Sequence, residues 1–246
     1  MHFLPAFSSL LLCTTFSAAA PFWGIFEQTS LTPYLTATIS SSIKSALKKA
    51  DVIPDVLAHD FKPTFSLLLS YPSTHDHVFL GNVLPRSNVS SKPVFEIHSL
   101  SPHPTPTQKN ATYTLVLTDP DATSRAEPVK AQMCHWIVTG LKLQPKDNSN
   151  AYILDARTTS EEHSSTLSEL ISYFAPAPPP KTGYHRYIFV LLVPKDSQDD
   201  GKGLQKPADR PHWGYGEEGA GVKEWADDNG LKAVGANFFY AQNEKQ

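Results

Sequence analysis

A run of β-favouring residues, YTLVLT at 113–118, stops at Asp119-Pro120. Tyrosine, valine and threonine are enriched in strands, so this run predicts a β-strand. Proline has no N–H group and cannot continue the hydrogen-bond ladder of a central strand. We therefore expect Asp119 and Asp121 to lie on a loop at the end of a strand.

Much of the remaining chain also has the pattern of short strands. Residues 61–71 and 94–97 are β-like, and the prolines and glycine between them indicate turns. A further strand is predicted near residues 237–241. No internal repeat and no linker to a second domain interrupts this pattern.

Two more predicted strands carry histidines. In the strand over 135–141, simple alternation places His135 on one face and Trp136 on the opposite face, where Trp136 belongs to the core. A long apolar strand over 184–193 places His185 and Tyr187 on a shared face. Both histidines thus lie near strand ends.

Three helices are expected. Thr32-Pro33 resembles an N-cap followed by proline, and apolar residues recur at helical spacing from 39 to 50. A second helix is predicted over 160–174, because Ser160 suits an N-cap, apolar residues follow at helical spacing and Pro176 ends the pattern. A short helix is predicted near 222–229, after a long exposed loop over 195–221.

The first twenty residues contain no Asp, Glu, Lys or Arg, and an apolar run is followed by small residues. This pattern predicts a secretory signal peptide over 1–19, with a short membrane anchor as the alternative. An extension with one amphipathic helix over 20–59 and one domain over 60–246 follow. The chain is therefore expected to be secreted or vacuolar, with candidate glycosylation sites at Asn88 and Asn110.

The charge balance argues against nucleic acid as a partner. The chain has 21 Lys and Arg against 24 Asp and Glu, and no block of like charges. Binding to a phosphate backbone requires clustered basic residues. Cys134, in the apolar segment MCHWIV, would be the single thiol left after signal removal and is expected in the core.

Asp119 and Asp121 are the first candidates for chemistry, because a turn between them can bring their carboxylates together. A close carboxylate pair raises one pKa, so one group can keep a proton and donate it to an anion. His135 and His185 would add donors that become cationic slightly below neutral pH. Anion binding is then expected to strengthen as the pH falls.

Three motifs in order, DPDATSR at 119, His135-Trp136 and GYHRYIFVLL from 183, resemble the phosphatidylethanolamine-binding protein family. Residues 84–97 and 224–242 resemble its flanking segments, so the resemblance covers roughly residues 60–242. It implies a mostly β fold, in which a large antiparallel sheet packs on a smaller sheet with flanking helices. Thr123 departs from the family pattern, which usually has a proline there.

The resemblance also implies a small anion pocket at one end of a sheet, for phosphate, acetate or a phospholipid head group. The matching positions are Asp119, Asp121, His135, His185 and Tyr187, with Pro178 and Pro179 on a bordering loop. Some family members inhibit serine carboxypeptidases. The protein is therefore expected to be a non-enzymatic binding protein without cofactor or bound metal, and a carboxypeptidase inhibitor.

Two other interpretations stay open. Asp119, Asp121 and Thr123 match the D-x-D-x-T motif of magnesium-dependent haloacid-dehalogenase-like phosphatases, for which Asp199, Asp200 and Lys202 could complete the site. Such enzymes need repeated βα units around a parallel sheet. Alternatively, Asp119, Asp121, His135 and His185 form a ligand set suited to a metal ion.

Overall fold

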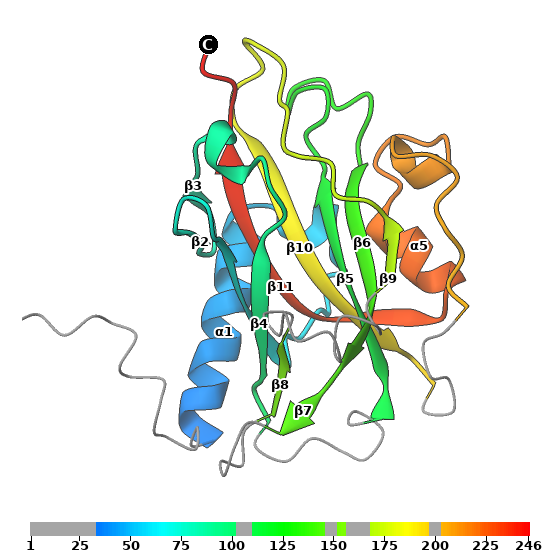
Figure 1. Ribbon diagram of the computed structural model, residues 1–246. Helices are drawn as coiled ribbons and strands as arrows, with labels where there is room; N and C mark the ends of the chain where they lie inside the picture. The colour runs from blue at the N-terminus through cyan, green and yellow to red at the C-terminus, as the bar shows by residue number, and fades with distance from the viewer. Residues whose placement is uncertain (1–32, 102–109, 146–151, 156–167, 197–202) are drawn as a thin grey trace, which may run out of the picture.

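The computed structural model describes residues 33–101, 110–145, 152–155, 168–196 and 203–246, which form a sandwich of two sheets (Figure 1). The smaller sheet has the order β2-β1-β4-β8-β7. Its strands are β1 (Phe65–Tyr71), β2 (Asp76–Val78), β4 (Val94–Ser99), β7 (Gln144–Pro145) and β8 (Tyr152–Asp155). All its strand pairs are antiparallel.

The larger sheet has the order β3-β11-β10-β5-β6-β9. Its strands are β3 (Asn82–Val83), β5 (Thr112–Asp119), β6 (Met133–Lys142), β9 (Ser168–Ile171), β10 (His185–Pro194) and β11 (Leu231–Ala241). Only the short β3 runs parallel to its neighbour, β11, among the described pairs. The predicted mostly β fold, with a large antiparallel sheet on a smaller one, is confirmed.

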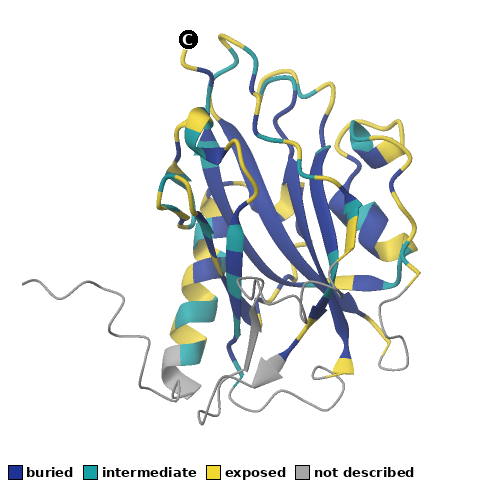
Figure 2. Cartoon of the chain, in the orientation of Figure 1, coloured by how far each residue is buried: buried dark blue, intermediate teal, exposed yellow. Residues whose placement is uncertain are grey.

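The central strands of the larger sheet are buried along their whole length, as the dark blue of β5 and β10 shows (Figure 2). Side chains of β10 alternate between two hydrophobic clusters. Tyr187 and Phe189 belong to the cluster between the sheets. Ile188 and Val190 belong to the cluster on the outer face of the larger sheet. Two apolar layers therefore hold β10 in the middle of the fold.

Helices cover that outer face. They are α1 (Pro33–Lys49), α2 (Val52–Asp55) and α5 (Val222–Asp228), with short 3-10 helices η2 (Arg86–Val89) and η3 (His212–Gly214) elsewhere. Ile43 and Leu47 of α1 are buried in the outer cluster together with Val222 of α5. The predicted amphipathic helix and the helix near residues 222–229 are thus confirmed.

The prediction of a helix over residues 160–174 is wrong for residues 168–174, the part that the structure describes. Ser168–Ile171 forms β9, an edge strand in which Ile171 pairs with Ile137 of β6. Glu169 also accepts a hydrogen bond from Trp136 Nε1 at 2.9 Å. These distant contacts override the local helical spacing. The first part of the predicted helix lies outside the described residues.

Other sequence predictions have mixed outcomes. The strand predicted near 237–241 is longer and begins at Leu231. The signal peptide over 1–19 lies outside the described residues, as do Asp199, Asp200 and Lys202. No helix in the described part of the chain is long and apolar enough to cross a membrane.

Candidate functional site

The end of β5 and the beginning of β10 form one end of the larger sheet, because these strands are antiparallel neighbours. Asp119 is the last residue of β5 and His185 is the first residue of β10. His185 Nδ1 lies 2.9 Å from Asp119 Oδ2, and both residues are buried. The predicted position of these two residues at strand ends is confirmed, and the fold brings them into direct contact.

Both ring nitrogens of His185 have hydrogen-bond partners. Thr182 donates its hydroxyl hydrogen to the carbonyl of Pro179 at 2.8 Å. The same hydroxyl lies 3.0 Å from His185 Nε2, and it has no second hydrogen to donate. His185 is thus held at both ring nitrogens, by the carboxylate of Asp119 at Nδ1 and by the hydroxyl of Thr182 at Nε2.

Asp121 has a different partner. Arg186 donates to it from Nε at 2.9 Å, from Nη2 at 2.6 Å and from its backbone N–H at 2.8 Å. Arg186 Nη1 also donates to Asp55 and to the carbonyl of Ala50, so this cluster lies on the helical side of the sheet. The proton-sharing pair predicted for Asp119 and Asp121 is therefore wrong. Asp121 is paired with Arg186, whereas Asp119 contacts His185.

His135 lies next to the Asp119 and His185 pair because of an irregularity in β6. Leu117 pairs with Trp136 and Thr118 pairs with Cys134, which leaves His135 in a bulge. The His135 ring meets the edge of Tyr187 with 5.3 Å between centroids. Tyr187 and Trp136 belong to the cluster between the sheets. The prediction that His135 and Trp136 face opposite sides is therefore wrong.

The protonation of His135 is governed by its burial. Its Nδ1 lies 2.7 Å from the carbonyl oxygen of Phe174, so Nδ1 carries hydrogen. Burial lowers the pKa of His135, and the nearby Asp119 carboxylate opposes that effect. The neutral ring leaves Nε2 as an acceptor. Protonation of His135 thus needs a lower pH than the ordinary pKa of histidine predicts.

Tyr187 completes this group of side chains. Its ring stacks on that of His185 with 6.4 Å between centroids and on Phe239 at 5.3 Å. Burial and the adjacent Asp119 carboxylate raise the pKa of Tyr187, so its phenol stays neutral and can donate a hydrogen bond. We call Asp119, His135, His185 and Tyr187 the strand-end site.

The proline-rich loop borders the strand-end site. Asn243 donates to the carbonyl of Pro178 at 3.0 Å, and Thr182 binds the carbonyl of Pro179. These bonds fix the loop against His185. Pro178 is buried and Pro179 is half-buried, so their backbone oxygens rather than their rings make the polar contacts.

Phe174 and Arg210 form an outer wall that no sequence motif predicts. Phe174 stacks on His135 with 5.3 Å between ring centroids. The Arg210 guanidinium lies 5.4 Å from the Phe174 ring centroid and donates to the backbone oxygens of Cys134 and Ser172. Residue 174 was expected in a helix, so no local signal pointed to this contact.

The alternative sites receive no structural support. Antiparallel pairing of β5 with β6 and β10 is incompatible with the parallel βα units of a haloacid-dehalogenase-like phosphatase. Among the described residues, no three His, Cys, Asp or Glu side chains are arranged to hold a metal ion. Asp121 instead lines a cavity of about 370 Å³ together with Arg125 and Arg186.

Comparison with known proteins supports the motif-based interpretation. The family model described as phosphatidylethanolamine-binding protein matches residues 74–239, which include every residue of the strand-end site. The chain belongs to the phosphatidylethanolamine-binding protein family. The resemblance inferred from the three motifs is thus confirmed.

One relative in this family, carboxypeptidase Y inhibitor, is matched both in sequence and in structure. The carboxypeptidase Y inhibitor of Saccharomyces cerevisiae is 36% identical over 207 residues, covering 80% of this chain and 93% of the inhibitor. A crystal structure of carboxypeptidase Y inhibitor with its cognate proteinase has a TM-score of 0.71 and 33% identity, covering 83% of this chain and 97% of that one.

A third comparison concerns the fold alone. A phosphatidylethanolamine-binding protein from Plasmodium vivax has a TM-score of 0.60 and 23% identity, covering 81% of this chain and 97% of that chain. The two-sheet architecture is therefore shared across distant members of the family.

Proposed function

We propose that this phosphatidylethanolamine-binding protein is a non-enzymatic inhibitor of a serine carboxypeptidase, with an anion pocket at the strand-end site. The observation that carries the proposal is the similarity to carboxypeptidase Y inhibitor, at 36% identity over 80% of the chain. The structure of that relative with its cognate proteinase supports a protease as the partner.

The strand-end site supports a particular class of anion. Asp119 is buried beside Tyr187 and His185, and its Oδ1 already accepts from the N–H of Asp121 at 2.7 Å, so a ligand that carries both a hydrogen-bond donor and an acceptor suits the site best. A phosphomonoester, a phospholipid head group or a protonated carboxylic acid carries both. A fully ionised anion without a proton is disfavoured by the charge of Asp119.

Asp121 has a supporting role in this proposal. Its carboxylate oxygens are occupied by Arg186, so it holds the loop after β5 in place instead of contacting the ligand. Pro178 and Pro179 likewise position the bordering loop through their carbonyl groups.

The protease proposal is tested by adding the purified protein to carboxypeptidase Y and measuring peptide hydrolysis. We expect stoichiometric inhibition. In parallel, inorganic phosphate, acetate and phosphoethanolamine are titrated into the protein and into Tyr187→Phe. Loss of the phenol hydroxyl is expected to weaken binding by about tenfold, and Tyr240→Phe is the control.

Several results would contradict these proposals. Absence of inhibition rejects the protease role, and unchanged anion binding by Tyr187→Phe rejects the strand-end site. Magnesium-dependent phosphatase turnover would reject the non-enzymatic assignment. Inhibition that survives loss of anion binding would show that the protease contact lies outside the pocket.

The proposed compartment is the secretory pathway, and Asn110 is the favoured glycosylation site. Asn110 is exposed, whereas Asn88 is half-buried and its Nδ2 donates to Asp76 at 2.9 Å. Attachment of a glycan to Asn88 would remove that bond. Amino-terminal sequencing of exported protein is expected to show a start near residue 20, and Asn110→Gln is expected to abolish the glycan mass. An intact Met1 would contradict export through a cleaved signal.

A further inference from the structure

The chain after β11 runs back past the loop that borders the strand-end site. Ala241, the last residue of β11, pairs with His185, the first residue of β10. Figure 1 shows the end of the chain, marked C, at the same end of the molecule as the loop that leads into β10. Residues 242–246 are therefore placed to contact residues 178–183 of that loop.

Asn243 joins this segment to the loop. Its side chain is buried, and its Nδ2 donates to the carbonyl of Pro178 at 3.0 Å. Its Oδ1 accepts from the N–H of Lys245 at 3.0 Å, which folds the segment into a turn. One buried side chain thus fixes both the segment and the loop.

Two further hydrogen bonds lie on either side of Thr182. The N–H of Lys181 donates to the carbonyl of Lys245 at 3.0 Å. The N–H of Gly183 donates to Oε1 of Gln246 at 3.0 Å. We call the three residues that bind the loop in this way the tail residues: Asn243, Lys245 and Gln246.

The backbone around Thr182 has a conformation that needs such support. Lys181 has a φ of 64° and Gly183 a φ of 73°. Glycine adopts this left-handed region readily, whereas for lysine it costs free energy. Such a residue persists only where its surroundings fix it, and the exposed side chain of Lys181 gains little from packing. We therefore expect the hydrogen bond from its N–H to Lys245 to stabilise this conformation.

Thr182 connects the loop to the strand-end site. Its hydroxyl lies 2.8 Å from the carbonyl oxygen of Pro179 and 3.0 Å from His185 Nε2. His185 in turn contacts Asp119 through Nδ1. Because the hydroxyl is only one carbon atom away from the backbone, it keeps both contacts only while residues 179–182 hold their conformation.

We infer that the tail residues are positioning residues of the strand-end site, which hold Thr182 against His185 and thereby increase the affinity for an anion. A pocket that is already ordered binds more tightly, because the ligand does not have to order it. The tail residues act through Thr182 and not by contact with the anion. This inference rests on the anion binding proposed above.

Calorimetric titration of inorganic phosphate into the full protein tests the inference. Gln246→Ala removes the acceptor for Gly183, and Asn243→Ala removes the donor to Pro178. Each variant is expected to bind phosphate about fivefold more weakly than the parent. Because Gln246 is exposed, Gln246→Ala is expected to fold even if Asn243→Ala does not.

Glu244→Gln is the matched control from the same segment. Glu244 is paired with Arg86 instead of the loop, and both side chains are exposed. This variant is expected to bind phosphate like the parent. Gln246→Glu keeps an acceptor for Gly183 and is expected to preserve binding, because its added charge is exposed to water and screened by salt.

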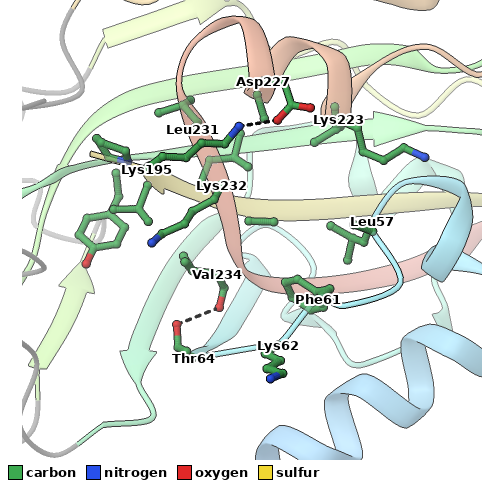
Figure 3. A pocket seen from close by; sticks show the side chains of 18 of the residues that line it. Leu57, Phe61, Lys62, Thr64, Lys195, Lys223, Asp227, Leu231, Lys232 and Val234 are labelled. Atoms are coloured by element: carbon green, nitrogen blue, oxygen red, sulfur yellow. Dashed lines mark hydrogen bonds and ion pairs between the residues drawn. The ribbon is translucent and has the colours of Figure 1, made fainter. Parts of the chain in front are cut away.

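The opposite end of β10 supplies a second control. Lys195 follows β10 at the edge of a cavity of about 1200 Å³ and is paired with Asp227 of α5 (Figure 3). This exposed pair lies at the other end of the strand from His185. Lys195→Gln is therefore expected to leave phosphate binding unchanged.

Two readouts separate positioning from a general loss of stability. The NMR signal of His185 Nε2 is expected to shift in Gln246→Ala and Asn243→Ala, because Thr182 leaves the ring, and to stay in place in both controls. In a Thr182→Val background, Gln246→Ala is expected to weaken phosphate binding no further, since it acts through the residue already replaced.

Phosphate binding as tight in both tail variants as in the parent would overturn the inference. Weaker binding with an unchanged His185 Nε2 signal, or an additive effect in the Thr182→Val background, would also overturn it, because the tail residues would then act without Thr182. Absence of phosphate binding by the parent would instead reject the proposed anion pocket. The His185 signal would still decide whether the tail residues hold Thr182 in place.

Discussion

Both carboxylate oxygens of Asp121 accept hydrogen bonds from the buried guanidinium of Arg186, at 2.9 Å from Nε and 2.6 Å from Nη2. The same guanidinium reaches Asp55 of α2 at 2.8 Å. One side chain thus joins the loop after β5, the beginning of β10 and the helical layer. This network holds the loop that begins at the strand-end site.

Removal of that guanidinium should be costly. Arg186→Gln leaves the carboxylate of Asp121 buried without its cation, so we expect unfolding to become easier by about 3–5 kcal/mol. Arg125→Gln breaks an exposed pair with Asp51 and should cost at most about 1 kcal/mol. Urea denaturation of both variants measures the difference. Equal costs would contradict the importance assigned to the buried pair.

Asn237 of β11 connects the two sheets. It donates from Nδ2 to the carbonyls of Leu67 and Val78, and its Oδ1 accepts from the N–H of Leu80. Because Asn237 is buried, Asn237→Ala should lower the free energy of unfolding by about 2–4 kcal/mol.

The matched control for that change is Asn82→Ala. Asn82 also binds backbone groups, the carbonyl of His77 and the N–H of Phe79, but it is partly exposed, so water can replace its side chain. We expect a loss of about 1 kcal/mol. Chemical denaturation is the measurement, and a control loss as large as that of Asn237→Ala would refute the burial argument.

The strands were predictable where the pattern of the core is local. Residues 113–118 and 184–193 are rich in apolar side chains, as expected for strands such as β5 and β10 that are covered on both faces, and Pro120 marks the end of β5. The prediction of a helix over residues 160–174 failed because the apolar spacing there fits a strand as well as a helix. The pairing of Ile171 with Ile137 of β6 stabilises a strand instead.

The strand-end site was predictable only in part. Asp119 and His185 follow from motifs at strand ends. The side of the sheet on which His135 lies depends on a bulge in β6. This bulge arises from the pairing of β5 with β6, so the alternation of residues within β6 does not reveal it. The partner of Asp121 was not predicted either. Arg186 follows His185 in β10, and its side chain lies on the helical side of the sheet, where it contacts Asp121.

Burial of His135 makes stability depend on pH. Its pKa is lowered in the folded protein, so below about pH 6.5 the unfolded chain binds more protons than the native state at this residue. The contribution of neutral His135 to the free energy of unfolding is therefore retained at higher pH. It is lost as the pH falls towards the lowered pKa of His135 in the folded protein. His135→Asn, which keeps a donor for Phe174, should remove this dependence.

The measurement is the free energy of unfolding in urea from about pH 7.5 to about pH 5. The parent is expected to lose stability more steeply than His135→Asn, by up to about 1.4 kcal/mol per pH unit in the window below pH 6.5. Parallel pH profiles of the parent and the variant would show that His135 titrates normally, which contradicts the assigned effect of burial.

Phe174 keeps water away from His135. Its ring covers one face of the imidazole, while Arg210 covers Phe174 from outside. Phe174→Ala therefore should expose the imidazole and raise the pKa of His135 towards its ordinary value, because burial is the main cause of the shift. Loss of the ring contacts should also cost about 1 kcal/mol of stability.

A titration of the His135 ring followed by NMR measures that pKa directly. Phe79→Ala is the control, because Phe79 is 69% exposed and lies on the loop between β2 and β3. The control is expected to leave the titration of His135 unchanged. If Phe174→Ala also leaves it unchanged, the shift arises from the remaining neighbours of His135, and Phe174 is not the wall that excludes water from the strand-end site. A raised pKa in Phe174→Ala alone would instead make Phe174 the residue that sets the pH range over which His135 becomes a cationic donor to an anion.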